Sequence, residues 1–245
     1  MAEFQSRVRT GSTAIPAVDP GLRAYMLRVY NYMLMGLALT GGVAFAVTNT
    51  PLGAAFFTFN EGGQVLGPNI LGWIAIFAPL GLVFFLSFRI QRMSLAAAQG
   101  TFWAYAGLMG VSMALILAQY TATSAARVFF ITAATFGAMS LWGYTTKRDL
   151  TGMGSFLFMG LIGILIASVV NMFLGSTMLQ FIVSVAGVLV FTGLTAYDTQ
   201  KSKENYSVAM DGTAAGKSAV MGALNLYLDF INLFMMLLRL LGDRR

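Results

Sequence analysis

The sequence predicts an all-α integral membrane protein that folds as a bundle of seven transmembrane helices. Apolar residues fill 58% of the 245 positions and charged residues only 10%, whereas soluble domains average about 25% charged residues. Seven stretches contain the roughly 20 mostly apolar residues that a helix needs to cross about 30 Å of hydrocarbon. Basic residues are concentrated in alternate connections between these stretches, which is typical of multi-pass proteins with one orientation.

The seven spans are separated by connections that are charged or rich in Gly, Asn and Pro. The first span follows Asp19-Pro20, a pair typical of a helix N-cap with proline at the first helical position. The longest connections cover residues 48–68 and 200–218. The predicted spans are, in order, 24–47, 69–88, 95–118, 125–144, 155–174, 178–199 and 219–241.

The N-terminal segment is polar, contains Pro16 and holds no apolar stretch of the kind found in signal peptides. We therefore expect the first span to direct insertion into the lipid bilayer. The chain then divides into a polar cytoplasmic tail, residues 1–22, and a membrane domain of seven helices, residues 23–245.

The distribution of basic residues predicts a cytoplasmic N-terminus. Eleven of the 15 lie in the tail or in connections on its side, and the alternate connections hold only Arg127. Seven crossings put the C-terminus outside, although Arg239, Arg244 and Arg245 lie near it, and we expect the last span to cross fully rather than re-enter. The eleven residues are Arg7, Arg9, Arg23, Arg28, Arg89, Arg92, Lys147, Arg148, Lys201, Lys203 and Lys217.

Composition also excludes several kinds of chemistry. The chain has no Cys and no His, which removes disulfides, thiolate or imidazole metal sites, and Ser-His-Asp triads. We expect no cofactor, no resident metal and no catalytic site. The net charge of +6 is scattered over the helix connections rather than gathered in one patch, so we expect no binding to nucleic acid.

Two acidic residues, Asp198 and Asp229, lie within apolar spans, whereas the other seven lie in tails or connections. An ionised carboxylate at the bilayer centre costs about 2.5–3.5 kcal/mol, so such residues usually face the bundle interior and mark a path for ions or protons. Helical periodicity puts each acid on a stripe that should face protein. The stripes are Asn225, Asp229, Asn232, Met236 and Arg239 in the last span, and Ser184, Gly187, Phe191, Thr195 and Asp198 in the sixth.

The relative depth of the two acids is not obvious from the sequence. Asp229 lies about 15 Å along its helix from Ala219 at 1.5 Å per residue, whereas Asp198 lies within one turn of Lys201. The acids therefore lie at different depths unless the seventh helix begins outside the bilayer. Arg89 ends the second span on the side where Asp198 ends the sixth, so we expect an ion pair between them.

Each acid also has a purely structural interpretation: Asp198 would neutralise Lys201, and Asp229 would hydrogen-bond an Asn or Tyr. If instead the acids share a site, their titrations are coupled and one carboxyl holds a proton at neutral pH. Deprotonation would then create a site of hard oxygen ligands suited to Ca²⁺ as a permeant ion.

Two pairs of small residues at helix-contact spacing predict close packing between helices. These pairs are Gly36 with Thr40 in the first span and Gly163 with Ala167 in the fifth. We interpret both as packing features without a catalytic role.

Three motifs together resemble the Bax inhibitor family. The last span, ALNLYLDFINLF at 223–234 followed by LLR at 237–239, is similar to the signature helix of that family. The segments GVLVF at 187–191 and AYDTQ at 196–200 resemble its sixth helix. The N-terminal runs LRAYM and VYNYM, within 22–33, resemble its bacterial branch.

The resemblance implies six helices around a central seventh and a pH-sensitive calcium leak across the cell (inner) membrane. It implies that the family's paired acids correspond to Asp198 and Asp229, and that the arginine holding them in the closed form corresponds to Arg89. Asn225 and Asn232 join these residues in the expected gating and ion pathway.

Three other functions are alternatives. An intramembrane aspartyl protease also pairs two Asp residues, and Tyr197-Asp198 resembles one of its motifs, but Asp229 follows LYL rather than Gly-x-Gly. A retinal receptor needs a lysine in a membrane helix, and all four lysines fall in predicted connections. A modulator of proteases or other membrane-protein partners, without ion transport, is the remaining alternative. The oligomeric state is left open.

Overall fold

The computed structural model describes residues 19–60, 62, 65–207 and 210–244, and these residues form seven long helices. Each helix is long and apolar enough to cross a membrane, which confirms the predicted bundle of seven spans. The expected tail lies mostly outside the described residues. The helices are α1 (Pro20–Asn49), α2 (Ile70–Arg89), α3 (Leu95–Leu117), α4 (Ala122–Thr145), α5 (Thr151–Leu174), α6 (Thr177–Glu204) and α7 (Gly212–Leu241).

Most helices begin at a side chain that caps their first free N–H groups. The Asp19 carboxylate accepts a hydrogen bond from the N–H of Gly21 over 2.9 Å, so the expected N-cap at Asp19-Pro20 is confirmed. Ser94, Thr121 and Ser176 cap α3, α4 and α6 in the same way. Local polar residues thus define where most apolar stretches begin as helices.

The connection 48–68 contains structure that the sequence analysis did not predict. A short 3₁₀ helix, Pro51–Ala55, leads into an antiparallel hairpin of β1 (Phe57–Phe59) and β2 (Val65–Pro68). The Asn69 side chain donates to the carbonyl of Ala55 over 2.9 Å and joins the 3₁₀ helix to the start of α2. Strands of three and four residues are too short to give a clear alternating pattern.

The connection 200–218 is shorter than expected because both flanking helices extend into it. The sixth helix continues to Glu204 and the seventh begins at Gly212. Lys201, Lys203 and Lys217 therefore lie on helix ends rather than in a loop, which corrects their expected placement.

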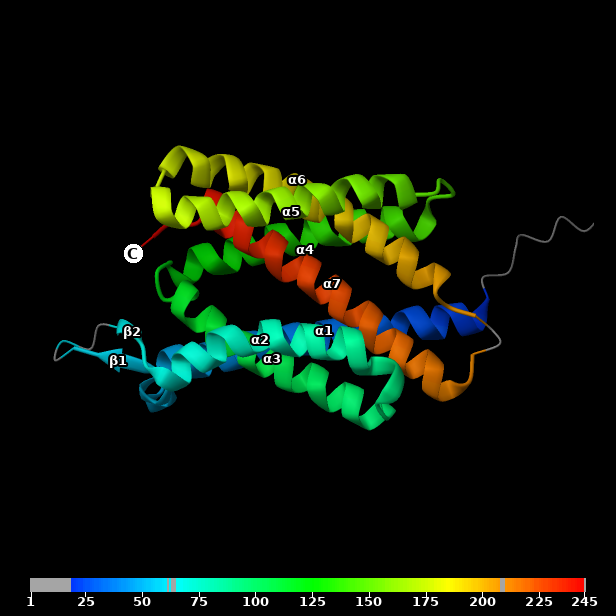
Figure 1. Ribbon diagram of the computed structural model, residues 1–245, viewed down its shortest axis with the longest axis horizontal. Helices are drawn as coiled ribbons and strands as arrows, with labels where there is room; N and C mark the ends of the chain where they lie inside the picture. The colour runs from blue at the N-terminus through cyan, green and yellow to red at the C-terminus, as the bar shows by residue number, and fades with distance from the viewer. Residues whose placement is uncertain (1–18, 61, 63–64, 208–209, 245) are drawn as a thin grey trace, which may run out of the picture.

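The central helix of the bundle is α7, as expected. Figure 1 shows α7 running diagonally between α1, α2 and α3 on one side and α4, α5 and α6 on the other. It packs against α1, α3, α4 and α6, whereas α2 packs mainly on α3 and α5 mainly on α6. Side chains on almost every face of α7 are buried, and α5 leaves most of its apolar side chains for lipid.

The last helix is continuous from Gly212 to Leu241 and runs the full length of the bundle, which agrees with the expected full crossing. The N–H of Thr121 donates to the carbonyl of Asp243 over 3.0 Å, and Arg127 forms a salt bridge with Asp243 over 3.1 Å. The end of the chain therefore lies at the α3–α4 connection, opposite the start of α1 (Figure 1).

One of the two predicted packing pairs holds helices together. A Cβ on Gly36 would lie 2.8 Å from Cζ of Phe102 in α3, so only glycine permits this approach. The hydroxyl of Thr40 lies 2.6 Å from the hydroxyl of Tyr227 in α7. Gly163 is exposed and has no atom within 4 Å of its Cβ position, so its predicted contact is wrong for this chain.

Candidate functional site

The two intramembrane acids meet at the interface between α6 and α7. Asp229 is buried, with 4% of its surface exposed, and Asp198 is half-buried. Their carboxyl groups lie close enough to interact with each other electrostatically and to share a hydrogen bond. A carboxylate can only accept, so this bond requires a proton on one of the two groups. The two acids therefore form one carboxyl pair between α6 and α7, and a hydrogen bond between them would need a shared proton.

The length and path of α7 explain why the acids meet despite their different distances from the helix ends. At 1.5 Å per residue its 30 residues extend about 45 Å, longer than the about 30 Å of a bilayer core. It begins seven residues before the predicted start and crosses the bundle diagonally (Figure 1). The early start of α7 agrees with the alternative that this helix begins before its apolar stretch, which lets the two acids meet.

The predicted stripe of the sixth helix faces the interior and carries Asp198 to the pair. Ser184, Gly187, Phe191 and Thr195 are all buried. A Cβ on Gly187 would lie 2.7 Å from Cγ of Met236, so α6 approaches the stripe of α7 closely at this level.

The surroundings of the pair contain one nearby cation. Lys201, one turn after Asp198, acts electrostatically on it and lies over the ring of Tyr197 at 5.4 Å. Among the described residues, no Asn or Tyr bonds to Asp229, and its Oδ2 has no hydrogen-bond partner. The structural interpretation of Asp198 is thus partly right, and that of Asp229 is wrong, because its partner is the other acid.

Arg89 is not part of the acid pair in this structure. Its side chain is exposed in the last turn of α2, a helix that packs on α3 rather than on α6. Within the described part of the chain, Arg127 with Asp243 is the only salt bridge. The expected ion pair between Arg89 and Asp198 is therefore absent, because α2, which carries Arg89, is not a neighbour of α6.

The two predicted amides lie on the same helix as Asp229 and are half-buried. The Asn232 side chain donates to the carbonyl of Leu228 over 2.8 Å, so this amide is turned toward its own helix. Asn225 lies one turn before Asp229. The predicted stripe is only partly right, because Asp229 and Met236 are buried, the two Asn are half-buried and Arg239 is exposed. The part of the two Asn in ion movement stays a prediction.

A hydrogen-bonded cluster at the tail side of α6 was missed by the sequence analysis. The hydroxyl of Ser140 lies 2.6 Å from that of Tyr30 and 3.0 Å from that of Thr199, one position after Asp198. Gln200 accepts from the buried N–H of Leu150 over 2.9 Å. These partners lie at least 50 positions apart in the chain, so no local pattern could reveal them.

Replacement of Gln200 by Leu is expected to lower the free energy of unfolding by about 1–3 kcal/mol, because the buried N–H of Leu150 loses its acceptor. Thermal or denaturant unfolding of the purified protein in detergent measures this difference. Gln91→Leu is the matched control, since the Gln91 side chain is exposed. Equal stability of the two variants would show that the contact has no net effect.

Seven apolar helices with two neighbouring carboxyl groups between α6 and α7 define the class of this protein as a multi-pass helical membrane protein with acidic residues in its interior. The chain belongs to the Bax inhibitor family: the family model described as Inhibitor of apoptosis-promoting Bax1 matches residues 22–245.

Bacterial relatives cover nearly the whole chain. The inner membrane protein YbhL of Escherichia coli is 47% identical over 237 residues, which cover 96% of this chain and 97% of YbhL. An uncharacterized protein of Rickettsia prowazekii is 49% identical over 227 residues, covering 93% of this chain and 92% of its own. An uncharacterized membrane protein of Streptococcus pyogenes is 36% identical over 226 residues, covering 91% and 94%.

Proposed function

We propose that this protein is a pH-sensitive calcium leak channel of the bacterial inner membrane, with its N-terminus in the cytoplasm, and that the Asp198–Asp229 pair is its gate. The observation that supports the proposal is the close approach of two carboxyl groups, one buried and one half-buried, between α6 and α7 of a membrane bundle. Intramembrane ionisable residues of this kind typically belong to ion or proton pathways.

The gate would act through the charge of the pair. While one proton is shared, the pair carries a single negative charge and its hydrogen bond joins α6 to α7. Loss of that proton leaves two like charges in contact, and about 4 Å apart they repel by about 4 kcal/mol at an effective dielectric constant of 20. The helices then separate, and the carboxylate oxygens become ligands for Ca²⁺.

The sign of the pH dependence follows from this scheme. The closed state binds one proton more than the open state, so a rise in pH favours the open state and a fall in pH favours the closed one. Arg89 has no role in this version of the gate, because it does not reach the pair.

The test is Ca²⁺ flux into proteoliposomes that contain the full chain and a calcium-sensitive dye, measured over a pH series. Flux that rises with pH supports the proposal, and flux equal to that of empty liposomes at every pH refutes it. A protein that passes no Ca²⁺ but co-purifies with a membrane protease would instead be the modulator considered above. Cleavage of a membrane substrate that Asp229→Asn abolishes would identify an aspartyl protease.

A further inference from the structure

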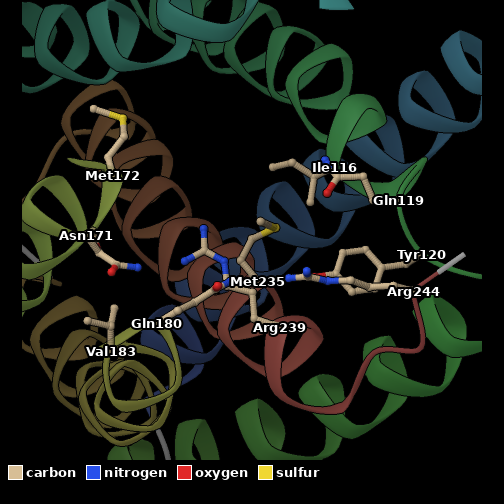
Figure 2. A pocket seen from close by; sticks show the side chains of 11 residues that line it. Ile116, Gln119, Tyr120, Asn171, Met172, Gln180, Val183, Met235, Arg239 and Arg244 are labelled. Atoms are coloured by element: carbon tan, nitrogen blue, oxygen red, sulfur yellow. The ribbon is translucent and has the colours of Figure 1, made fainter. Parts of the chain in front are cut away.

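A second polar site lies far from the acid pair, at the end of the bundle where α7 terminates. A cavity of about 390 Å³ opens there between the ends of α3, α5, α6 and α7. Its lining includes the side chains of Arg239 and Arg244. Figure 2 shows Asn171 and Gln180 on one side of Arg239, and Arg244 with Tyr120 on the other.

Among the described residues, the cavity lining carries positive charge and no acid. Its described lining contains two guanidinium groups and no carboxylate. The acid next to Arg244 in the chain, Asp243, is already paired with Arg127 over 3.1 Å. Arg239 has no ion-pair partner among the residues that the structure describes. Two guanidinium groups that line one cavity repel each other unless an anion joins them.

Hydrogen bonds of the residues just before Arg244 hold it beside the cavity. The N–H of Asp243 donates to Ser124 over 2.8 Å, and Arg127 donates to the carbonyl of Leu241 over 3.1 Å. The guanidinium of Arg244 lies 5.9 Å from the ring centre of Tyr120. The α3–α4 connection therefore fixes the position of the second arginine.

The polar side chains opposite the arginines add hydrogen-bond donors. The Oδ1 atom of Asn171 accepts from the N–H of Ser176 over 3.0 Å, which turns its oxygen toward the backbone and leaves its NH₂ group as a donor. Gln180 contributes a second amide to the lining. Guanidinium and amide N–H groups together match the several acceptor oxygens of a phosphate group.

We propose that this outer cavity binds a phosphate oxyanion through Arg239 and Arg244, with Asn171 as an additional donor. The phosphate could come from the headgroup of an anionic phospholipid or from free inorganic phosphate, because both present the same oxygens. The inference does not depend on the proposed calcium leak, since the cavity and the acid pair lie on different parts of α7.

The experiment uses the full chain, purified and delipidated in a neutral detergent. Inorganic phosphate is titrated calorimetrically with chloride as the control anion. Native mass spectrometry then compares retention of phosphatidylglycerol with that of phosphatidylcholine. Phosphate binding identifies a soluble anion site, and selective retention of phosphatidylglycerol identifies a lipid headgroup site, so either result supports the proposal.

Arg239→Gln is expected to weaken binding of whichever probe binds the wild type, inorganic phosphate or phosphatidylglycerol, by about tenfold or more. The reason is the loss of a bidentate charge-assisted contact. Arg92→Gln is the matched control, since Arg92 is exposed at the other end of the bundle. If Arg239→Gln fails to fold, Arg244→Gln provides the second test with the same expected loss. Binding of neither probe, or equal binding by the site variant and the control, would overturn the proposal.

Discussion

Simultaneous replacement of Asp198 and Asp229 by Asn is expected to remove the pH dependence of calcium flux. Asn has nearly the same shape as Asp, and two amides can keep one hydrogen bond between α6 and α7 without any titratable group. With no proton to lose, the variant cannot develop the repulsion of about 4 kcal/mol between paired carboxylates. Flux should stay at the low level that the wild type shows at acidic pH.

The single variants test the contribution of each carboxyl group in turn. Asp198→Asn and Asp229→Asn each leave one carboxyl, so neither can produce two like charges in contact. We expect each to reduce flux at high pH by about tenfold or more, equivalent to at least about 1.4 kcal/mol of lost opening energy. Glu204→Gln is the matched control, since Glu204 is an exposed acid at the end of α6. A double variant with the wild-type pH profile would refute the gate.

Gly143→Leu is expected to be the most destabilising single change considered, with a loss of about 3 kcal/mol in unfolding free energy. A Cβ at Gly143 would lie 2.8 Å from Cα of Ala196, so any side chain meets the backbone of α6. A backbone cannot change rotamer, and only separation of α4 from α6 relieves the clash. Because Ala196 lies two positions before Asp198, the same change should disturb the acid pair.

The control for this substitution lies on the same helix. Gly137→Leu adds the same side chain at an exposed position of α4, where no atom lies within 4 Å of the Cβ position. We expect it to unfold like the wild type in detergent. If both glycine variants lose equal stability, the helix interior rather than the α4–α6 contact is responsible.

Hydropathy and length were sufficient to predict the seven spans because lipid imposes both on any helix that crosses it. Charge inside an apolar stretch was sufficient to single out Asp198 and Asp229, since that placement is costly unless a partner compensates. The stripe of α6 also faced the interior as its periodicity predicted. These are properties of single helices, and they can be predicted from one segment of the sequence at a time.

Contacts between helices could be predicted from the sequence much less well. The meeting of Asp198 with Asp229 depends on the tilt of α7 and on turns that precede its apolar stretch. The absence of Arg89 from the pair depends on α2 packing against α3 rather than α6. The cavity at the end of α7 brings Asn171 and Arg239 together from α5 and α7. None of these follows from periodicity, because they are set by which helices become neighbours.

The central position of α7 has a consequence for how the protein is made. This helix is synthesised after the other six, yet α1, α3, α4 and α6 all pack against it. Until it inserts, Tyr227 cannot reach Thr40 and Asp198 has no carboxyl partner. Without α7 the four helices that pack against it lack their central partner, so we expect chains that terminate before residue 212 to be substrates for membrane quality-control proteases.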